Sequence, residues 1–186
     1  MSFLLDYFNE KENKKNNEFT ISVAETVTAG SLSNSLCSDI DICKIFKGGI
    51  VSGDIYNILK QLNINSKYKN TDILNPFLSY DIAKNVTKLF DSRIGMATTG
   101  FSLPTVIDIN EIDNKTLNSQ NGKIEIKVPF AYICLYDSKT EEQIIKKINI
   151  EYNNNISEQL NKASMQAKVA IEGKKIYEKY KKLNEL

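Results

Sequence analysis

The run Ile21-Ser-Val-Ala-Glu-Thr-Val-Thr-Ala-Gly-Ser31 is the feature that most constrains how this chain can fold. Apolar residues alternate at Phe19, Ile21 and Val23, which predicts a strand. Small residues follow, and the segment from Leu32 to Leu36 then predicts a helix. A strand that turns sharply into a helix leaves the first N–H groups of that helix without partners inside it. We therefore take this turn as the first candidate for a functional site.

The hydroxyl groups in this turn have two interpretations. Small residues allow an anion, a phosphate or a developing oxyanion to approach the start of the helix. Thr26, Thr28 or Ser31 would then contact the ligand or attack it. In the other interpretation the same side chains are ordinary N-caps, each contributing about 1 kcal/mol to helix stability. The local pattern is compatible with both.

Length and charge predict a single globular domain. The chain has 186 residues, and we expect one α/β domain over residues 18–186 after an N-terminal helix and linker over 1–17. Phe3, Leu4, Tyr7 and Phe8 give that helix an apolar side. The formal net charge is +1 and the basic residues are scattered, so we expect no nucleic-acid partner. We also expect no membrane association, because no apolar run approaches the ~20 residues of a span.

Cysteine and histidine usage narrows the chemistry. The three cysteines form an odd set and no secretory signal is recognisable, which predicts reduced thiols and a cytoplasmic location. The absence of histidine excludes His-dependent acid–base catalysis and His-rich metal sites. We expect Cys37 and Cys43 to be small buried apolar residues. We expect neither a metal nor a cofactor.

Helices and strands alternate along the rest of the chain. We predict a turn at 39–43, a loop at 63–76 and a polar insertion at about 105–125. Periodicity predicts helices at 54–62, capped by Asp54, at 79–90, capped by Ser79, and at 156–183, and strands at 45–51, 93–98, 129–136 and 143–152. This order predicts a three-layer α/β/α sandwich with a mixed, mostly parallel central sheet of about five strands. Ligands of such sheets bind beyond the carboxyl ends of the strands, so the loops after residues 24, 51 and 98 are expected to form one cleft.

Several segments resemble, in the same order, the motifs of the CinA C-terminal family. Stand-alone members of that family include nicotinamide mononucleotide (NMN) amidohydrolases. The resemblance implies the CinA C-terminal fold, a pyridine nucleotide ligand and self-association into a homo-oligomer. The segments are Ala24-Glu-Thr-Val-Thr-Ala-Gly30 for A-E-S-x-T-G-G, Phe46-Lys-Gly-Gly-Ile-Val51 for F-x-x-G-x-V, Ala97-Thr-Thr-Gly-Phe-Ser-Leu-Pro104 for the T-G-I-A-G-P loop, and Tyr132-Ile-Cys-Leu135 for Y-I-A-L.

The resemblance also implies the positions of a site, and two of them depart from the family. Its amidohydrolases are Ser/Lys hydrolases; the serine position is Thr26 here, and the lysine position is Ile58. Lys60 lies two residues further along the predicted helix, which rotates it by about 200° away from that side. The implied ligand-binding residues are Glu25, Thr28, Ala29, Gly30, Gly53, Asp54, Thr99 and Gly100.

Two functional hypotheses follow. The first is a non-catalytic member of the family, which has lost the dyad and binds a nucleotide or a protein partner. The second is an active NMN amidohydrolase with Thr26 as nucleophile. With no lysine at position 58, Asp54 or Glu25 would then have to be the base, and a carboxylate is a weak base for a hydroxyl. A different chemistry in the same cleft would use Asp54, Ser52 and Thr99.

Overall fold

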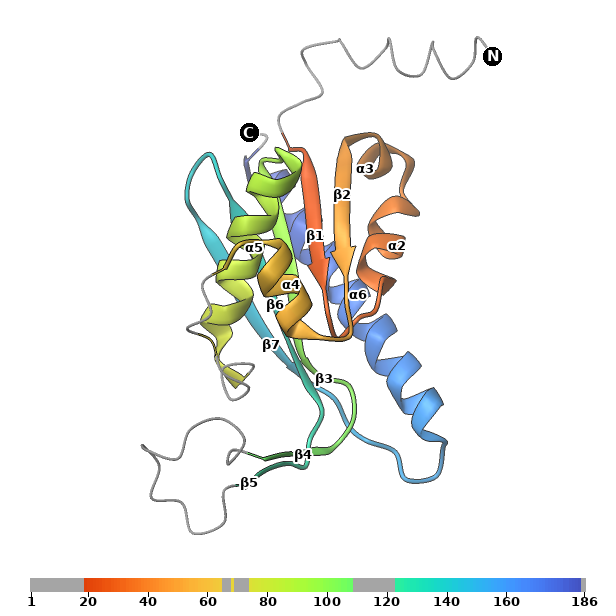
Figure 1. The fold of residues 1–186 in the computed structure, drawn as a ribbon. Helices are drawn as coiled ribbons and strands as arrows, with labels where there is room; N and C mark the ends of the chain where they lie inside the picture. Colours follow the sequence, from red (N-terminus) through yellow and green to blue (C-terminus); the bar gives the residue numbers. More distant parts are fainter. Residues whose placement is uncertain (1–18, 65–67, 69–73, 109–122, 185–186) are drawn as a thin grey trace, which may run out of the picture.

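The chain folds into three layers around a five-stranded sheet (Figure 1). The computed structural model describes residues 19–64, 68, 74–108 and 123–184. The predicted N-terminal helix over 1–17, with Phe3, Leu4, Tyr7 and Phe8, lies outside the described residues, as does the part of the polar insertion at 109–122. Among the described residues, no helix combines the length and the apolar character that crossing a bilayer requires.

The central sheet is parallel at one end and antiparallel at the other. Its strands are β1 (Ile21–Glu25), β2 (Phe46–Val51), β3 (Ile94–Phe101), β6 (Phe130–Asp137) and β7 (Gln143–Asn149). They lie in the order β2-β1-β3-β6-β7. β1 runs parallel to β2 and β3, whereas β6 is antiparallel to β3 and β7. This is the predicted mixed sheet, with the β6–β7 hairpin at its far edge.

Helices cover both faces of the sheet, which confirms the three-layer α/β/α sandwich (Figure 1). On one face lie α4 (Ile55–Gln61) and α5 (Pro76–Phe90). On the other lie α2 (Ser31–Cys37), α3 (Ile40–Ile45) and α6 (Glu158–Asn184). Val23 of β1 packs into the apolar cluster under α2 and α6, whereas its neighbour Ala24 packs into the cluster under α4 and α5. Every residue of β1 is buried because the strand has a helical layer on each side.

Glycines in β2 allow a bulge and a close approach, as their place inside a strand predicts. Ile21 pairs with Phe46 but Ser22 pairs with Gly48, so Lys47 is the additional residue of β2. Gly48 has φ 146°, and a Cβ there would lie 2.5 Å from the Phe90 ring. A side chain at this position would therefore separate β2 from α5.

Two predicted local features are wrong. Residues 39–43 are not a turn, because Asp39 accepts the N–H groups of Asp41 and Ile42 and thereby caps α3. Nor is Ser79 a helix cap. α5 begins earlier, at Pro76, with Asn75 as its N-cap, and the Ser79 hydroxyl donates to the Pro76 carbonyl. Proline fits the first position of a helix because its missing N–H would be unpartnered there anyway.

The predicted strand at 93–98 is too short. Thr99, Gly100 and Phe101 continue β3 and pair with β6, so they are strand rather than loop residues. A Cβ on Gly100 would lie 2.2 Å from the Phe130 carbonyl oxygen, which explains a glycine in this strand. Beyond it, β4 (Thr105–Asp108) and β5 (Lys123–Ile126) pair as a two-stranded ribbon that the sequence did not predict.

Candidate functional site

The side chain of Glu25 occupies the start of α2, where one of the two interpretations of the sequence placed a bound anion. Its carboxylate is fully buried. Oε1 accepts the N–H of Ser33 at 2.7 Å and its hydroxyl at 2.5 Å. Oε2 accepts the N–H groups of Gly30 and Leu32, each at 3.0 Å, and the Thr28 hydroxyl at 2.6 Å. The positive end of α2 is thus satisfied by a carboxylate of the chain itself.

The turn between β1 and α2 has backbone angles that small residues accept. Ala29 has φ 50° and Gly30, the N-cap residue, has φ 94°. No side-chain hydroxyl caps α2, so the simple N-cap interpretation of Thr26, Thr28 and Ser31 is not what the structure shows. The Thr28 hydroxyl instead joins Glu25 to the Thr98 hydroxyl, which lies 2.6 Å away. Thr28 and Thr98 are both fully buried, so they position the turn.

Thr26 lies at the carboxyl end of β1 and is half-buried. Its Oγ1 donates to the Thr98 carbonyl at 2.9 Å, and its N–H donates to the same oxygen at 3.1 Å. The hydroxyl proton is therefore held by a carbonyl, which does not act as a general base. The oxygen of Thr26 keeps lone pairs that can accept a hydrogen bond from a ligand.

The position that the resemblance assigns to the catalytic lysine lies in the hydrophobic core. Ile58 is fully buried and packs with Leu59, Leu78 and Ile82 under α4 and α5. Lys60 is exposed. The sequence-based expectation that Lys60 does not substitute for residue 58 agrees with this placement.

The loop after β2 lies beside the β1–α2 turn. The Ser52 N–H donates to the Glu25 carbonyl at 3.0 Å. Asp54 is the predicted N-cap of α4, and its Oδ1 accepts the Tyr56 N–H at 2.9 Å. Gly53 and Asp54 are both exposed, and a Cβ on Gly53 would meet no atom within 4 Å. This loop therefore offers open surface next to Thr26.

Thr99 has an unusual environment. It is fully buried, and within the described part of the chain its Oγ1 is a buried side-chain oxygen that has no hydrogen-bond partner. Its strand neighbour Thr98 has a bonded hydroxyl on the opposite face of the sheet. A buried hydroxyl without a partner costs about 1–3 kcal/mol.

The residues predicted to bind a ligand thus lie at one edge of the sheet, but they differ in burial and in hydrogen bonding. Register places Glu25 between Val51 of β2 and Thr98 of β3. Buried or structurally engaged positions are Glu25, Thr28, Thr99 and Gly100. Those with open or half-open surface are Thr26, Ala29, Gly30, Gly53 and Asp54.

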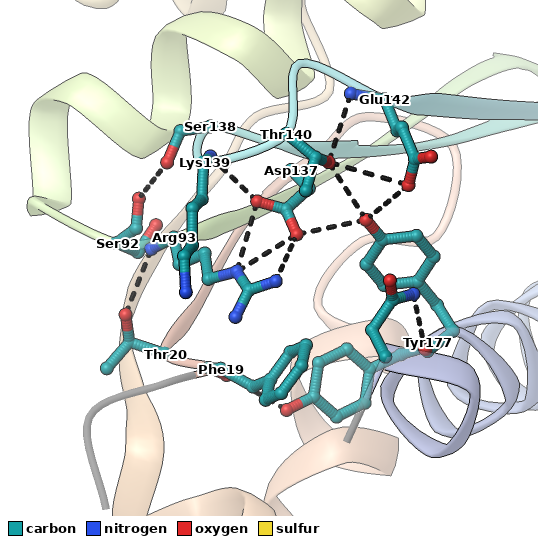
Figure 2. A network of polar contacts seen from close by, with 12 residues as sticks. Phe19, Thr20, Ser92, Arg93, Asp137, Ser138, Lys139, Thr140, Glu142 and Tyr177 are labelled. Carbon is teal, nitrogen blue, oxygen red and sulfur yellow. Dashed lines mark hydrogen bonds and ion pairs between the residues drawn. The ribbon is translucent and has the colours of Figure 1, made fainter. Parts of the chain in front are cut away.

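A second polar cluster, which the sequence did not reveal, lies at the opposite end of β3 (Figure 2). Arg93 Nε contacts both carboxylate oxygens of Asp137, at 3.1 and 2.9 Å, and its Nη2 lies 2.8 Å from Oδ2. The Tyr180 hydroxyl of α6 lies 2.9 Å from Asp137 Oδ2 and 2.9 Å from Glu142 Oε2, and shares its one proton between them. The sequence contains one signal for this cluster, which is that the apolar run of β6 ends in a charged residue, Asp137.

The electrostatics of this cluster fit a structural clamp. Burial alone would raise the pKa of Asp137, but the bonds from Arg93, the Lys139 N–H and Tyr180 outweigh it and hold that pKa below its ordinary value. Burial, together with the neighbouring carboxylates, raises the pKa of Tyr180 to about 12. A charged Asp137 and a neutral Tyr180 therefore join β6 to α6 at physiological pH.

The cysteines differ from one another. Cys134 is fully buried, and burial raises the pKa of its thiol to about 12, so it stays protonated. Cys37 is half-buried and Cys43 is exposed, so the expectation that both are buried is wrong. Cys43 is exposed because it lies on α3, whose buried residue is Ile42 instead. Among the residues that the structure describes, no group of three His, Cys, Asp or Glu side chains could hold a metal ion.

The fold and the β1–α2 turn define a class of three-layer α/β proteins with solved relatives. Competence damage-inducible protein A (ComA) from Klebsiella pneumoniae has 12% identity, covers 96% of this chain and 95% of its own, and superposes with a TM-score of 0.62. A competence-damaged protein (CinA) superfamily protein from Escherichia coli has 11% identity over 90% of this chain and 87% of its own, with a TM-score of 0.54.

Sequence comparison gives the family. The model of the CinA C-terminal domain matches residues 9–110, more than half of the chain, so this protein belongs to the CinA C-terminal domain family. A CinA-like protein from Dictyoglomus turgidum is 27% identical over 118 residues, which are 63% of this chain and 25% of the relative. A putative competence-damage inducible protein from Listeria innocua is 31% identical over 90 residues, 48% of this chain and 22% of the relative. The chain thus spans about a quarter of the curated relatives that it matches.

Proposed function

We propose that this protein is a non-catalytic member of the CinA C-terminal family that acts by binding a nucleotide or a protein partner. The observation that carries the proposal is Ile58, which is fully buried at the position where the family resemblance expects a lysine. A lysine there would have to leave the apolar cluster under α4 and α5 to reach Thr26. A change of side chain alone therefore does not restore a Ser/Lys dyad.

The environment of Thr26 supports the same proposal. Its proton is donated to the Thr98 carbonyl, so the hydroxyl is not paired with a base. Of the two carboxylates expected as substitutes, Glu25 is buried among donors from the β1–α2 turn. Asp54 is exposed, and one of its oxygens caps α4.

The ligand surface that remains is the open part of the same edge. We propose that a pyridine nucleotide contacts Thr26, Ala29, Gly53 and Asp54, which lie beyond the ends of β1 and β2. The buried carboxylate of Glu25 already accepts the N–H groups of Gly30, Leu32 and Ser33, so we expect the ligand to contact the open residues of this edge rather than the start of α2. Without nucleotide binding, the same open surface would serve a protein partner.

The test is incubation of the purified protein with NMN. Nicotinate mononucleotide and ammonia are measured for turnover, and the melting temperature is measured for binding. Three proteins are compared: wild type, Thr26→Ala, and Lys60→Ala as a control on an exposed side chain of α4. We expect no turnover in any of them, and a rise in melting temperature with NMN that is smaller in Thr26→Ala than in Lys60→Ala.

The outcomes separate the two functional hypotheses. Turnover that Lys60→Ala keeps and Thr26→Ala abolishes would overturn the proposal in favour of an amidohydrolase with Thr26 as nucleophile. The half-exposed position of Thr26 at a strand end is the observation that favours this second candidate. Neither turnover nor a thermal shift would exclude the pyridine nucleotide and leave a protein as the proposed partner.

A further inference from the structure

Two cysteines meet at the junction of α2 and α3. Cys37 is the last residue of α2, and Cys43 lies within α3. Only residues 38 and 39 separate the two helices, which follow one another beside β2 (Figure 1). The Cys43 side chain is a hydrogen-bond partner of the Cys37 thiol. The two sulfur atoms are therefore neighbours in the folded chain.

The backbone and the core hold this pair in place. The Cys43 N–H donates to the Asp39 carbonyl at 2.8 Å, and the Asp39 N–H donates to the Leu36 carbonyl at 3.2 Å. Leu36 and Ile42 are buried in the same apolar cluster. Each cysteine directly follows one of these two buried residues in the sequence. The two thiols thus belong to helices that are anchored in one core, and not to a free loop.

The two thiols differ in their access to solvent. Cys43 is exposed, whereas Cys37 is half-buried. Burial, together with the neighbouring Cys43, raises the pKa of the Cys37 thiol above its ordinary value. Cys37 is therefore protonated at neutral pH, and a dissolved oxidant reaches Cys43 first. This gives the pair an exposed thiol that is oxidised and an adjacent thiol that can react with the product.

We propose that Cys37 and Cys43 are a redox modification site, which closes to a disulfide when the protein meets hydrogen peroxide. In the first step the Cys43 sulfur attacks the O–O bond of the peroxide, which gives a sulfenic acid and one water molecule. In the second step the Cys37 sulfur attacks the Cys43 sulfur. The S–S bond forms, the S–O bond breaks, and the hydroxyl group leaves with the Cys37 proton as a second water molecule.

The electron balance makes the site reversible. The two thiols together give two electrons to one peroxide molecule, and a dithiol reductant returns them by thiol–disulfide exchange. Cys37 also protects Cys43, because it consumes the sulfenic acid before further oxidation to a sulfinic acid, which dithiols do not reduce. Intracellular disulfides are mostly of this transient kind. The proposal does not rest on the proposed ligand function, because neither cysteine is among the predicted ligand residues.

Intact mass after treatment with hydrogen peroxide tests this proposal. Wild type, Cys37→Ser and Cys43→Ser are compared, and all three keep Cys134, which is fully buried and serves as the internal control. We expect wild type to lose the mass of two hydrogen atoms and to regain it with dithiothreitol. Cys37→Ser should instead gain oxygen atoms at Cys43 that dithiothreitol does not fully remove. Cys43→Ser should react at least about tenfold more slowly than Cys37→Ser.

Several outcomes would overturn the proposal. One is a wild-type protein that gains oxygen without losing hydrogen. Another is a disulfide that still forms in Cys37→Ser, or a wild-type chain that is linked to a second chain on a non-reducing gel, since the bond would then join other cysteines. Equal rates of oxidation in Cys37→Ser and Cys43→Ser would also contradict it, because exposure would not then select Cys43.

Discussion

Glu25 Oε1 lies 2.7 Å from the Ser33 nitrogen, so the last residue of β1 caps the first turn of α2. This bond passes from the sheet to a helical layer and fixes the turn between them. It also fills, from within the chain, the place where an anionic ligand was one expectation. The role of Glu25 is therefore to hold the edge of the sheet in shape.

Glu25→Gln should destabilise the protein strongly. An amide nitrogen would face N–H donors, so at least one hydrogen bond is lost and a donor is left buried. We expect the free energy of unfolding to fall by roughly 2–3 kcal/mol. Urea denaturation measures it, with Asp54→Asn as the control, since asparagine is as good an N-cap as aspartate. Equal effects of the two variants would contradict the structural role of Glu25.

Thr99→Val and Thr98→Val should change stability in opposite directions. The Thr99 hydroxyl is buried without a partner in the described structure, so its removal should stabilise the protein by about 1 kcal/mol. The Thr98 hydroxyl is bonded to Thr28, so its removal should destabilise by a similar amount. Thermal unfolding compares the two. A loss of stability in Thr99→Val would indicate that a water molecule satisfies this hydroxyl.

Ile58→Lys tests whether the position that the family resemblance assigns to the lysine tolerates a charge. Burying an ammonium group under α4 and α5 should lower the free energy of unfolding by roughly 3–5 kcal/mol. Ile58→Met, which keeps the volume, should lower it by less than about 1.5 kcal/mol. Urea denaturation gives both values. A fully stable Ile58→Lys protein would mean that the lysine reaches solvent, which would contradict the proposal that a charge is not accommodated at this position.

Asp137→Asn should remove a stabilisation that depends on pH. The folded pKa of Asp137 lies below its ordinary value of 3.8, so the charged form stabilises the fold above about pH 4. That contribution is lost as the pH falls from 3.8 toward the lower folded pKa. We expect Asp137→Asn to be less stable than wild type by roughly 3 kcal/mol at neutral pH, with the difference disappearing in acid. Unfolding free energies across this range check it, with the exposed Asp41→Asn as control.

The layers of the fold could be read from local pattern. Periodicity in α5 reflects the side of the helix that faces the core, and the apolar residues of β1 and β6 reflect strands that are buried on both faces. The bulge at Lys47 agrees with the glycines inside β2, since a glycine within a strand often marks a bulge or a close backbone approach. Element boundaries were less predictable: Gly100 resembles a loop residue until its close contact with β6 is known.

The sequence by itself determined the three-layer class and the resemblance to the family motifs, and that resemblance implies that Thr26 and Ile58 stand at the serine and lysine positions. The tertiary structure decided what these residues meet. The Glu25 side chain bonds to α2, and Arg93 pairs with Asp137, which lies forty-four residues away in the sequence. β4 pairs with β5 outside the main sheet. Periodicity predicts only the direction in which a side chain points, and the Arg93–Asp137 pair joins segments that are far apart in the chain. What lies in that direction depends on how the layers pack.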